Sequence, residues 1–222
     1  MKVDVRLYVI VDPAACAGRD PLWVADMAAR GGATIIQLRD KHGQSRQRLQ
    51  LARRMKEVLA AHGVPLVIND DVPLAAGSGA DGAHVGQDDM AVAEARGLLG
   101  EEAIIGLSHQ TAGHVDASPV DELDYVAIGG VFATSSKKQA RAPIGPEGLR
   151  ALSERLRRRA PDMPVVAIAG VDASNAAGVI EAGADGVAVI SAVCAAEDPL
   201  LAARRLRRRV DAALAARRGE GA

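Results

Sequence analysis

Short apolar segments and segments of helical periodicity alternate eight times along this chain of 222 residues. Most of the apolar segments end abruptly at polar residues, which is typical of a buried parallel strand. Most of the helical segments end near a glycine, a common stop signal. We expect strands at residues 7–11, 33–38, 64–68, 82–85, 103–107, 125–128, 164–168 and 186–190, and helices at 21–30, 44–62, 71–77, 89–99, 110–118, 147–159, 172–182 and 199–216.

This alternation predicts an α/β fold, a (β/α)8 TIM barrel formed as a single domain by residues 1–222. A doubly wound open sheet also alternates strands and helices, but it usually has fewer strands and a glycine-rich first turn. Here the first strand ends in Val11-Asp12-Pro13, and no G-x-G-x-x-G motif follows it. The two halves of the chain also echo each other, because Gly-Ala-Asp-Gly introduces the apolar segments at both 82–85 and 186–190.

The composition disfavours several classes of function. Apolar residues make up 49% of the chain and charged residues 25%, and the formal net charge is −1, which does not favour binding to nucleic acid or a membrane surface. Aromatic residues, at 2%, are too few for base-stacking platforms. No apolar run suits a transmembrane helix, and the first residues lack the apolar block of a signal peptide. With Cys16 and Cys194 expected to be free thiols, we predict a cytoplasmic protein without a nucleic-acid or membrane partner.

Two arginine-rich stretches, at residues 155–159 and 204–209, are the strongest basic features of the sequence. Apolar residues such as Leu156, Leu206 and Val210 interrupt them at helical positions. They therefore indicate solvated helix faces rather than a nucleic-acid site.

Polar side chains gather where the predicted strands end, which is the active-site face of a TIM barrel. Gln37, Arg39 and Lys41 occupy alternate positions, so an extended backbone would direct all three to the barrel mouth. Two cations and an amide there suit a ligand with several phosphate charges. Solvated surface charges are the alternative for Arg39 and Lys41, although Gln37 lies within the apolar segment itself.

Acidic clusters follow the next two predicted strands. Asn69 and Asp70 come after residues 64–68, and Asp88 and Asp89 come after residues 82–85. Neighbouring strands lie about 4.8 Å apart, so Asp70 and Asp89 are within reach of one hard cation. Helix N-capping by Asn69 and Asp88 is the alternative. It is favoured for any single acid, whereas the metal site is at least its equal for the pair.

A phosphate site is predicted on the other side of the mouth. Residues 134–137 supply three hydroxyls and a lysine in a glycine-containing loop, a set that suits a phosphate, with a flexible solvent loop as the alternative. Gly170 and Ser191 open the segments after the last two strands, where this fold usually builds its phosphate cradle.

Together these motifs resemble those of the thiamine phosphate synthase family. The resemblance rests on Gln37-Leu-Arg-Asp-Lys41, Ile68-Asn-Asp-Asp71, His84-Val-Gly-Gln-Asp-Asp89, Gly106-Leu-Ser108, residues 125–138 and Gly183-Ala-Asp-Gly186. It implies a TIM-barrel transferase that uses Mg²⁺ to join 4-amino-2-methyl-5-(diphosphooxymethyl)pyrimidine to 4-methyl-5-(2-phosphooxyethyl)thiazole, forming thiamine monophosphate and pyrophosphate. The implied mechanism is dissociative: the diphosphate leaves first, and the thiazole nitrogen then attacks the pyrimidine cation.

The resemblance also implies a role for each matching residue. The implied catalytic residues are Arg39, Ser108 and Lys137, and the implied Mg²⁺ ligands are Asp70 and Asp89. The implied pyrimidine-diphosphate site consists of Gln37, Leu38, Arg39, Asp40, Lys41, Asn69, Ser108 and Lys137, and the implied thiazole-phosphate site of Thr134, Ser135, Ser136, Gly170, Ile190 and Ser191.

Two positions depart from the family pattern. The usual Thr-x-Thr is Thr134-Ser135-Ser136 here, and since serine keeps the hydroxyl donor we expect function to survive. The usual Gly-Gly is Ala169-Gly170, and an alanine forced to a positive φ would strain the cradle.

Two other functions fit parts of the pattern. A thiazole tautomerase on the same barrel would not need the full set of cations and metal-binding acids, and a non-catalytic barrel that binds a phosphate ligand would need no metal ligands. Both are therefore disfavoured. His84 could line the mouth or serve as a core histidine, and His109 could be catalytic only in a different reaction.

Overall fold

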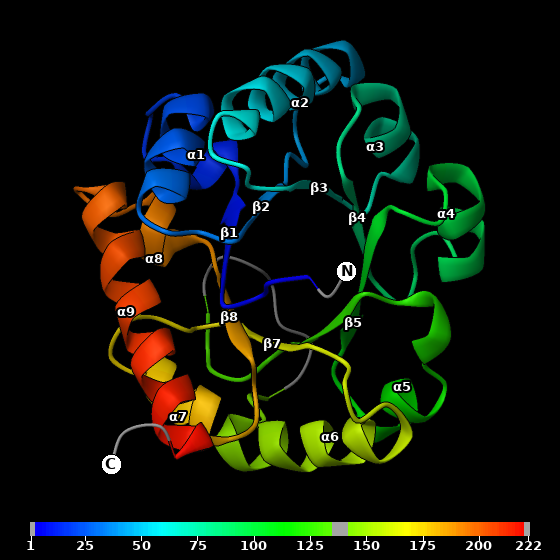
Figure 1. The fold of residues 1–222 in the computed structure, drawn as a ribbon. Helices are drawn as coiled ribbons and strands as arrows, with labels where there is room; N and C mark the ends of the chain where they lie inside the picture. The colour runs from blue at the N-terminus through cyan, green and yellow to red at the C-terminus, as the bar shows by residue number, and fades with distance from the viewer. Residues whose placement is uncertain (1–2, 135–141, 220–222) are drawn as a thin grey trace.

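The computed structural model, which describes residues 3–134 and 142–219, confirms the TIM barrel. Parallel strands close on themselves in sequence order, with β8 hydrogen-bonded to β1. Figure 1 looks along the barrel and shows the helices surrounding it, with the N-terminal segment lying across the barrel opening. The strands are β1 (Leu7–Val11), β2 (Ile35–Leu38), β3 (Leu66–Asn69), β4 (Gly82–Val85), β5 (Ile104–His109), β6 (Tyr125–Ile128), β7 (Val165–Ile168) and β8 (Gly186–Val189).

The helices follow the predicted order with three corrections. The sequence predicts a helix from residue 172, but α7 begins at Ala176. The sequence predicts a helix from residue 89, but α4 begins at Val92, after a turn that uses Asp89. The four-residue α8 is not predicted, because a single turn carries no periodicity. The helices are α1 (Pro21–Arg30), α2 (Ser45–Ala60), α3 (Val72–Ser78), α4 (Val92–Leu99), α5 (Ala112–Asp116), α6 (Gly145–Arg159), α7 (Ala176–Glu181), α8 (Ser191–Cys194) and α9 (Pro199–Arg218), with short 3-10 turns η1 (Pro13–Ala15) and η2 (Val120–Glu122).

Alternate side chains of each strand enter two different cores. One face packs against the helices, and the other fills the barrel interior, where Tyr8, Ile35, Val67 and Tyr125 are buried together. Gly106 makes room for this interior, since a β-carbon there would lie 2.1 Å from the ring of Tyr125. The interior layer of the barrel is therefore built around two tyrosines.

A repeated polar contact closes the end of the barrel opposite the active-site face. A side chain just before each even-numbered strand accepts a hydrogen bond from a backbone N–H of the preceding odd-numbered strand. The donor is the first residue of that strand, or the second in β5. In three of the four cases this side chain is an aspartate, and a lysine or arginine forms an ion pair with it. The contacts are Thr34 to Leu7 N, Asp81 to Leu66 N, Asp124 to Ile105 N and Asp185 to Val165 N. The echoed Gly-Ala-Asp-Gly segments thus have a structural role.

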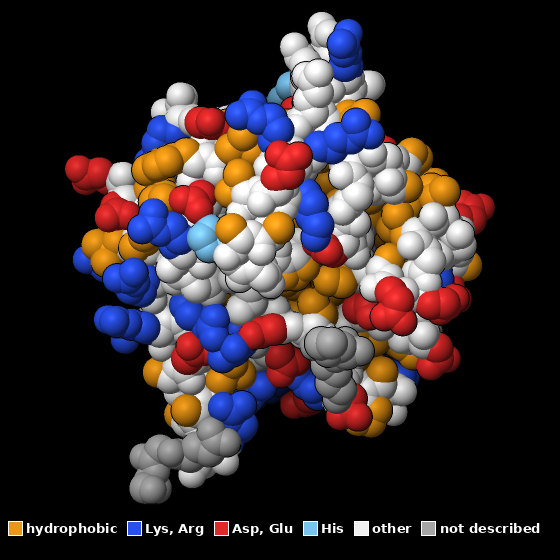
Figure 2. Space-filling view, turned by 45° about the horizontal axis from the view of Figure 1, so that its top comes forward, with side chains coloured by type: hydrophobic (Ala, Val, Ile, Leu, Met, Phe, Trp, Pro, Cys, Tyr) orange, Lys and Arg blue, Asp and Glu red, His pale blue; other side chains and the backbone are white. Residues whose placement is uncertain are grey.

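The arginine-rich stretches lie on α6 and α9, and several of these arginines are ion-paired. Arg157 pairs with Asp185 at 2.9 Å, and Arg207 pairs with Asp211 of its own helix and donates to the carbonyl of Gly32 at 2.9 Å. Figure 2 shows basic and acidic side chains interspersed on the face it presents. The stretches therefore fasten helices to their neighbours, in addition to facing solvent. None of the described helices combines the length and the apolar character needed to cross a membrane.

Candidate active site at the barrel mouth

The mouth of the barrel brings together basic side chains that the sequence places after β2. Arg39 pairs with Asp12, which follows β1, and both side chains are largely buried. Lys41 lies 3.1 Å from Asp70, which follows β3, and is about half exposed. The two cations thus lie toward opposite neighbouring strands, Arg39 toward β1 and Lys41 toward β3. Asp12 is a site residue that the sequence did not reveal, since an acid before a proline also suits a turn.

Asp70 and Asp89 meet at the ends of β3 and β4, as predicted from strand adjacency. Burial opposes the ionisation of Asp70, but the hydrogen bond and charge of Lys41 outweigh it and lower the pKa of Asp70. Burial raises the pKa of Asp89, and the negative charge of Asp70 raises it further. The 2.7 Å hydrogen bond from Gly86 N–H acts in the opposite direction but does not cancel these two effects. The second carboxylate is therefore held beside the first at an electrostatic cost that a cation would remove.

This pair fits a magnesium site of the kind that shares its ion with a phosphate ligand. Mg²⁺ typically takes one or two carboxylates from the protein and keeps water or substrate phosphate in its other positions. Within residues 3–134 and 142–219, no cluster of three or more acidic, histidine or cysteine side chains could hold a metal alone. The two carboxylates with the neighbouring cations are the donor set expected when the diphosphate completes the coordination.

The backbone at Asp70 has an unusual conformation. Its φ is +63°, which non-glycine residues seldom adopt. Its N–H donates to the carbonyl of His84 at 2.8 Å, which ties the end of β3 to β4. This conformation turns the chain sharply at the point where the carboxylate must face the mouth.

The capping alternatives are resolved by the helix starts. Asp71 caps α3 through Leu74 N–H at 2.9 Å, so Asn69 is not a cap but the last residue of β3. Asp88 is not a cap either, because Ala91 occupies that position of α4. Asn69 therefore remains a predicted ligand contact.

The Gln37–Lys41 segment presents alternate residues to the mouth. Gln37 is buried in the barrel, whereas Leu38 packs on the outer face of the strand, among the helices. Asp40 accepts hydrogen bonds from the N–H groups of His42 and Gly43, which closes the turn after β2. The side chains of Leu38 and Asp40 thus support the segment, and only their backbone lies in position to face a ligand.

A chain of hydrogen bonds runs through the barrel interior from Gln37 on β2 to Ser108 on β5. Gln37 Nε2 lies 2.7 Å from the Tyr8 hydroxyl, which lies 2.8 Å from the Tyr125 hydroxyl. The Tyr125 hydroxyl lies 2.9 Å from His84 Nδ1, and His84 Nε2 lies 2.8 Å from Ser108 Oγ. His84 therefore faces the interior beneath the mouth. The tyrosines were not predicted, because a tyrosine within an apolar strand resembles ordinary core.

The turn after β7 carries the strain that the sequence suggested. Ala169 has φ +86° and Gly170 has φ +64°. The chain before residue 135 pairs with this turn, since Phe132 N–H donates to the carbonyl of Ala169 at 3.0 Å. A β-carbon at Gly170 would lie 2.4 Å from the carbonyl oxygen of Ala133, so only glycine fits there. The Ala169–Gly170 turn and the loop after β6 are thus built against each other.

The remaining predicted phosphate contacts lie near this turn or outside the described residues. Ile190 precedes α8 and Ser191 begins it, with Ser191 exposed. Thr134 is half-buried at the edge of the described chain. Ser135, Ser136 and Lys137 lie outside the described residues.

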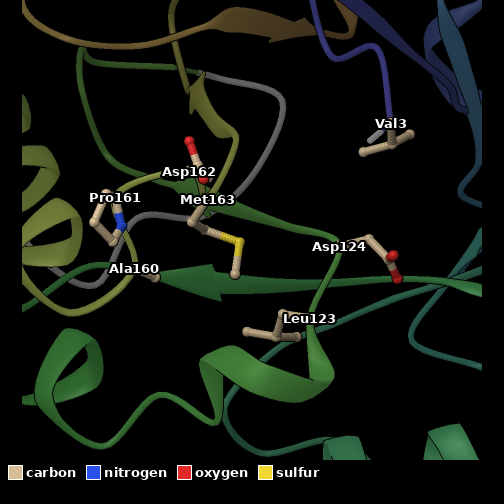
Figure 3. Close-up of a pocket in the computed structure, with 7 residues that line it drawn as sticks. All are labelled: Val3, Leu123, Asp124, Ala160, Pro161, Asp162 and Met163. Atoms are coloured by element: carbon tan, nitrogen blue, oxygen red, sulfur yellow. The ribbon is translucent and has the colours of Figure 1, made fainter. Parts of the chain in front are cut away.

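Two further features lie away from the mouth. His109 is fully buried on the helix-facing side of β5, where burial lowers its pKa to about 4, so it takes no part in the site. Figure 3 shows a cavity of about 370 Å³ at the opposite end of the barrel, lined by residues such as Val3, Leu123 and Met163. Its Asp124 is already engaged by Arg96 at 2.9 Å. The residues that line this cavity include the carboxylates of Asp124 and Asp162 but no lysine or arginine to match those of the mouth.

Comparison with known proteins gives one consistent result. A family model described as thiamine monophosphate synthase matches residues 7–193. A thiamine-phosphate synthase of Agrobacterium fabrum is 49% identical over 97% of this chain and 98% of its own length, and one of Chloroflexus aurantiacus is 45% identical over 92% of each chain. A solved thiamine phosphate pyrophosphorylase of Pyrococcus furiosus superimposes with a TM-score of 0.83 at 32% identity, covering 96% of this chain and 98% of that one. An orotidine 5'-phosphate decarboxylase of Pyrococcus horikoshii, 17% identical with a TM-score of 0.66 over 92% of this chain and 99% of its own, shares the fold.

Proposed function

Because the chain belongs to the thiamine monophosphate synthase family, we propose that its barrel mouth binds a pyrimidine diphosphate and a thiazole phosphate together. The chain is a thiamine-phosphate synthase, a transferase of thiamine biosynthesis, and it is the site and the mechanism that are proposed here. The observation that carries the proposal is the meeting of Asp70 and Asp89 beside Lys41 at the end of β3 and β4.

The pyrimidine diphosphate occupies the side of the mouth formed by β2 to β5. Gln37 and Ser108 face the pyrimidine, while Arg39 and Lys41 face the diphosphate. Asp12 holds the Arg39 guanidinium in place, so the cation is positioned before the substrate binds. Asn69, Lys137 and the backbone of Leu38 and Asp40 complete this side.

Asp70 and Asp89 would hold Mg²⁺ against the diphosphate. The ion would supply positive charge to the leaving group, in the way that bound metals assist phosphate chemistry. Lys41 already pairs with Asp70 without it, whereas burial and the negative charge of Asp70 raise the pKa of Asp89, a cost that the ion would relieve. The donor set of the mouth thus suits the metal.

The reaction needs a leaving group to be stabilised and needs no general base. The bond between the pyrimidine methylene and the diphosphate oxygen breaks with both electrons on oxygen, and Arg39 and Lys41 meet the charge that develops there. The cationic methylene is stabilised by the electron-rich pyrimidine. The thiazole nitrogen then donates its lone pair to that carbon, which forms the new C–N bond.

The thiazole phosphate occupies the side formed by β6 to β8. Gly170 N–H and the start of α8 offer backbone donors, and Thr134 with the serines after it offers hydroxyls. The contact between Phe132 N–H and the Ala169 carbonyl brings the chain just before Thr134 beside the turn that carries Gly170. The proposed phosphate contacts are Thr134, Ser135, Ser136, Gly170, Ile190 and Ser191.

Residues 1–222 are proposed to act as one catalytic domain in the cytoplasm. Cys16 and Cys194 are both free thiols, as expected in a reducing compartment. Nucleic acid and membranes are not proposed as partners, since the reaction needs only two small phosphorylated substrates.

A product assay separates this function from its two alternatives. The purified protein is incubated with both phosphorylated substrates, once with Mg²⁺ and once with EDTA, and thiamine phosphate is measured. Coupling only with metal supports the proposal. Isomerisation of the thiazole phosphate without coupling would identify a tautomerase, and binding without turnover would identify a phosphate-binding barrel. The names of the relatives reported above favour coupling.

A further inference from the structure

We propose that Tyr8, Tyr125 and His84 are positioning residues that hold Gln37 as a hydrogen-bond acceptor and Ser108 as a donor toward the aminopyrimidine. The proposal deepens the proposed function and rests on it, because Gln37 and Ser108 are pyrimidine contacts only there. It assigns a substrate-recognition role to residues of the barrel interior that lie below the mouth.

The direction of the chain begins at Gln37. Its amide nitrogen donates to the Tyr8 hydroxyl at 2.7 Å, because an amide nitrogen cannot accept. The Tyr8 and Tyr125 hydroxyls lie 2.8 Å apart, and we assign the single Tyr8 hydrogen to Tyr125, because the Gln37 nitrogen cannot accept it. Tyr125 in turn donates its hydrogen to His84 Nδ1 at 2.9 Å. One fixed donor thus orders every hydrogen along the chain.

The same direction sets the state of His84 and Ser108. Since Nδ1 of His84 accepts, the neutral ring carries its hydrogen on Nε2, which donates to Ser108 Oγ at 2.8 Å. Ser108 therefore accepts from below and directs its own hydroxyl hydrogen to the mouth. At the other end, Gln37 directs one amide N–H to Tyr8, which fixes the side-chain amide with its carbonyl oxygen on the opposite side of the group from that nitrogen.

These two ends match the chemistry of an aminopyrimidine. Gln37 offers an acceptor for the amino group, and Ser108 offers a donor for a ring nitrogen that bears a lone pair. A 4-oxo pyrimidine presents the reverse pattern, an acceptor oxygen beside a ring N–H. The chain therefore favours the amino compound over its oxo analogue, since a mismatch leaves buried polar groups unpaired.

Burial keeps the chain ordered. Tyr8 is 1% exposed and Tyr125 is fully buried, so water does not compete for their hydroxyls. Burial raises the pKa of both tyrosines, and both therefore keep their hydrogens throughout the physiological range. The rings are also held by contact, with His84 stacked on Tyr125 at a centroid distance of 5.5 Å.

The first test reads the tautomer of His84 in the ligand-free protein by ¹⁵N NMR, with its signals assigned by their loss in His84→Gln. The Nε2–H tautomer is expected, and in Tyr125→Phe, which removes the donor to Nδ1, the resonances of this ring should shift. An Nδ1–H tautomer would mean that the chain runs the other way, which would overturn the proposal. This measurement needs no coupling activity, so a failure of the positioning chain can be told apart from a failure of the proposed function.

The second test compares the 4-amino substrate with its 4-oxo analogue in Tyr125→Phe and Tyr8→Phe. Each variant is expected to lose about ten-fold in kcat/KM for the amino substrate, to narrow the preference over the oxo analogue, and to keep the KM for the thiazole phosphate. Ile10→Val, which trims the same interior layer without touching the chain, is the packing control and should leave the preference unchanged. Equal losses for both pyrimidines, or a preference that narrows equally in Ile10→Val, would refute the positioning role. If Tyr125→Phe does not fold, the tautomer of His84 is measured in Tyr8→Phe instead, and its resonances are again expected to shift.

Discussion

Replacing Ala169 with glycine should stabilise the folded protein. Ala169 has φ +86°, a region where an L-residue other than glycine costs about 1–2 kcal/mol. Glycine removes this cost, but it also makes the unfolded chain more flexible, which lowers the free energy of unfolding by about 0.4–1 kcal/mol. The net expectation is a gain of about 0.5–1 kcal/mol in the free energy of unfolding, or about 1–4 °C in Tm for a chain of this size.

Equilibrium unfolding in urea measures this gain, and a second alanine of the same loop gives the control. Ala173 is half-buried in the β7–α7 connection, and its φ is not positive. Ala173→Gly therefore relieves no strain; it bears the unfolded-state penalty and also loses the packing of its β-carbon against the core, so it should lose at least about 0.4–1 kcal/mol. The two substitutions, four residues apart and chemically identical, should move stability in opposite directions.

The strain argument would be refuted if Ala169→Gly lowered stability as much as Ala173→Gly. A gain in stability with an unchanged KM for the thiazole phosphate would show that the alanine strains the turn without distorting the phosphate contacts. The reciprocal change, Gly170→Ala, should be strongly destabilising, because its β-carbon would meet the Ala133 carbonyl at 2.4 Å.

Three further predictions test separate parts of the structure. Asp185→Asn should lower the free energy of unfolding by about 1–2 kcal/mol, since Asp185 accepts from Val165 N–H and pairs with Arg157 and Arg217. The control is Glu197→Gln at an exposed position, and equal stabilities of the two variants would contradict a stabilising role for the Asp185 contacts. His109 is neutral in the folded protein, because its pKa is about 4 there against 6.5 in the unfolded chain. The free energy of unfolding, measured in urea, should therefore fall by about 2 kcal/mol between pH 7 and pH 4.5. His109→Leu should abolish that part of the loss, and an unchanged pH dependence in this variant would show that His109 does not cause it. Arg39→Lys should reduce coupling while leaving thiazole-phosphate binding intact, because lysine cannot reproduce the paired geometry of a guanidinium; wild-type rates for this variant would remove Arg39 from the site.

Much of the fold could be predicted because each element carries a local signal. The bounds of β1, β4 and β6 coincide with their apolar segments, since a polar residue or a glycine follows each one directly. The start of α4 was predicted too early, because the acids at 88 and 89 resemble a helix start but instead form the turn after β4. Single-turn α8 has no periodic signal to detect.

The site was predictable only where strand order decides proximity. Asp70 and Asp89 had to meet, because their strands are neighbours in any barrel of this order. The pairing of Arg39 with Asp12 depends on how far a long side chain reaches, which spacing does not encode. Tyr8 and Tyr125 lie on β1 and β6, so their contact depends on how the barrel interior is filled.

The central proposal is that Asp70 and Asp89 together hold the metal for the diphosphate. The decisive measurement is the coupling rate as a function of Mg²⁺ concentration for the wild-type protein, Asp89→Asn and Asp88→Asn. Asp88 is exposed and adjacent in the same turn, so its variant should match the wild type. Asp89→Asn should lose at least about 100-fold, more than is usual for a residue that only supports a ligand, and should need higher Mg²⁺. A wild-type rate and Mg²⁺ dependence in Asp89→Asn would contradict the metal site.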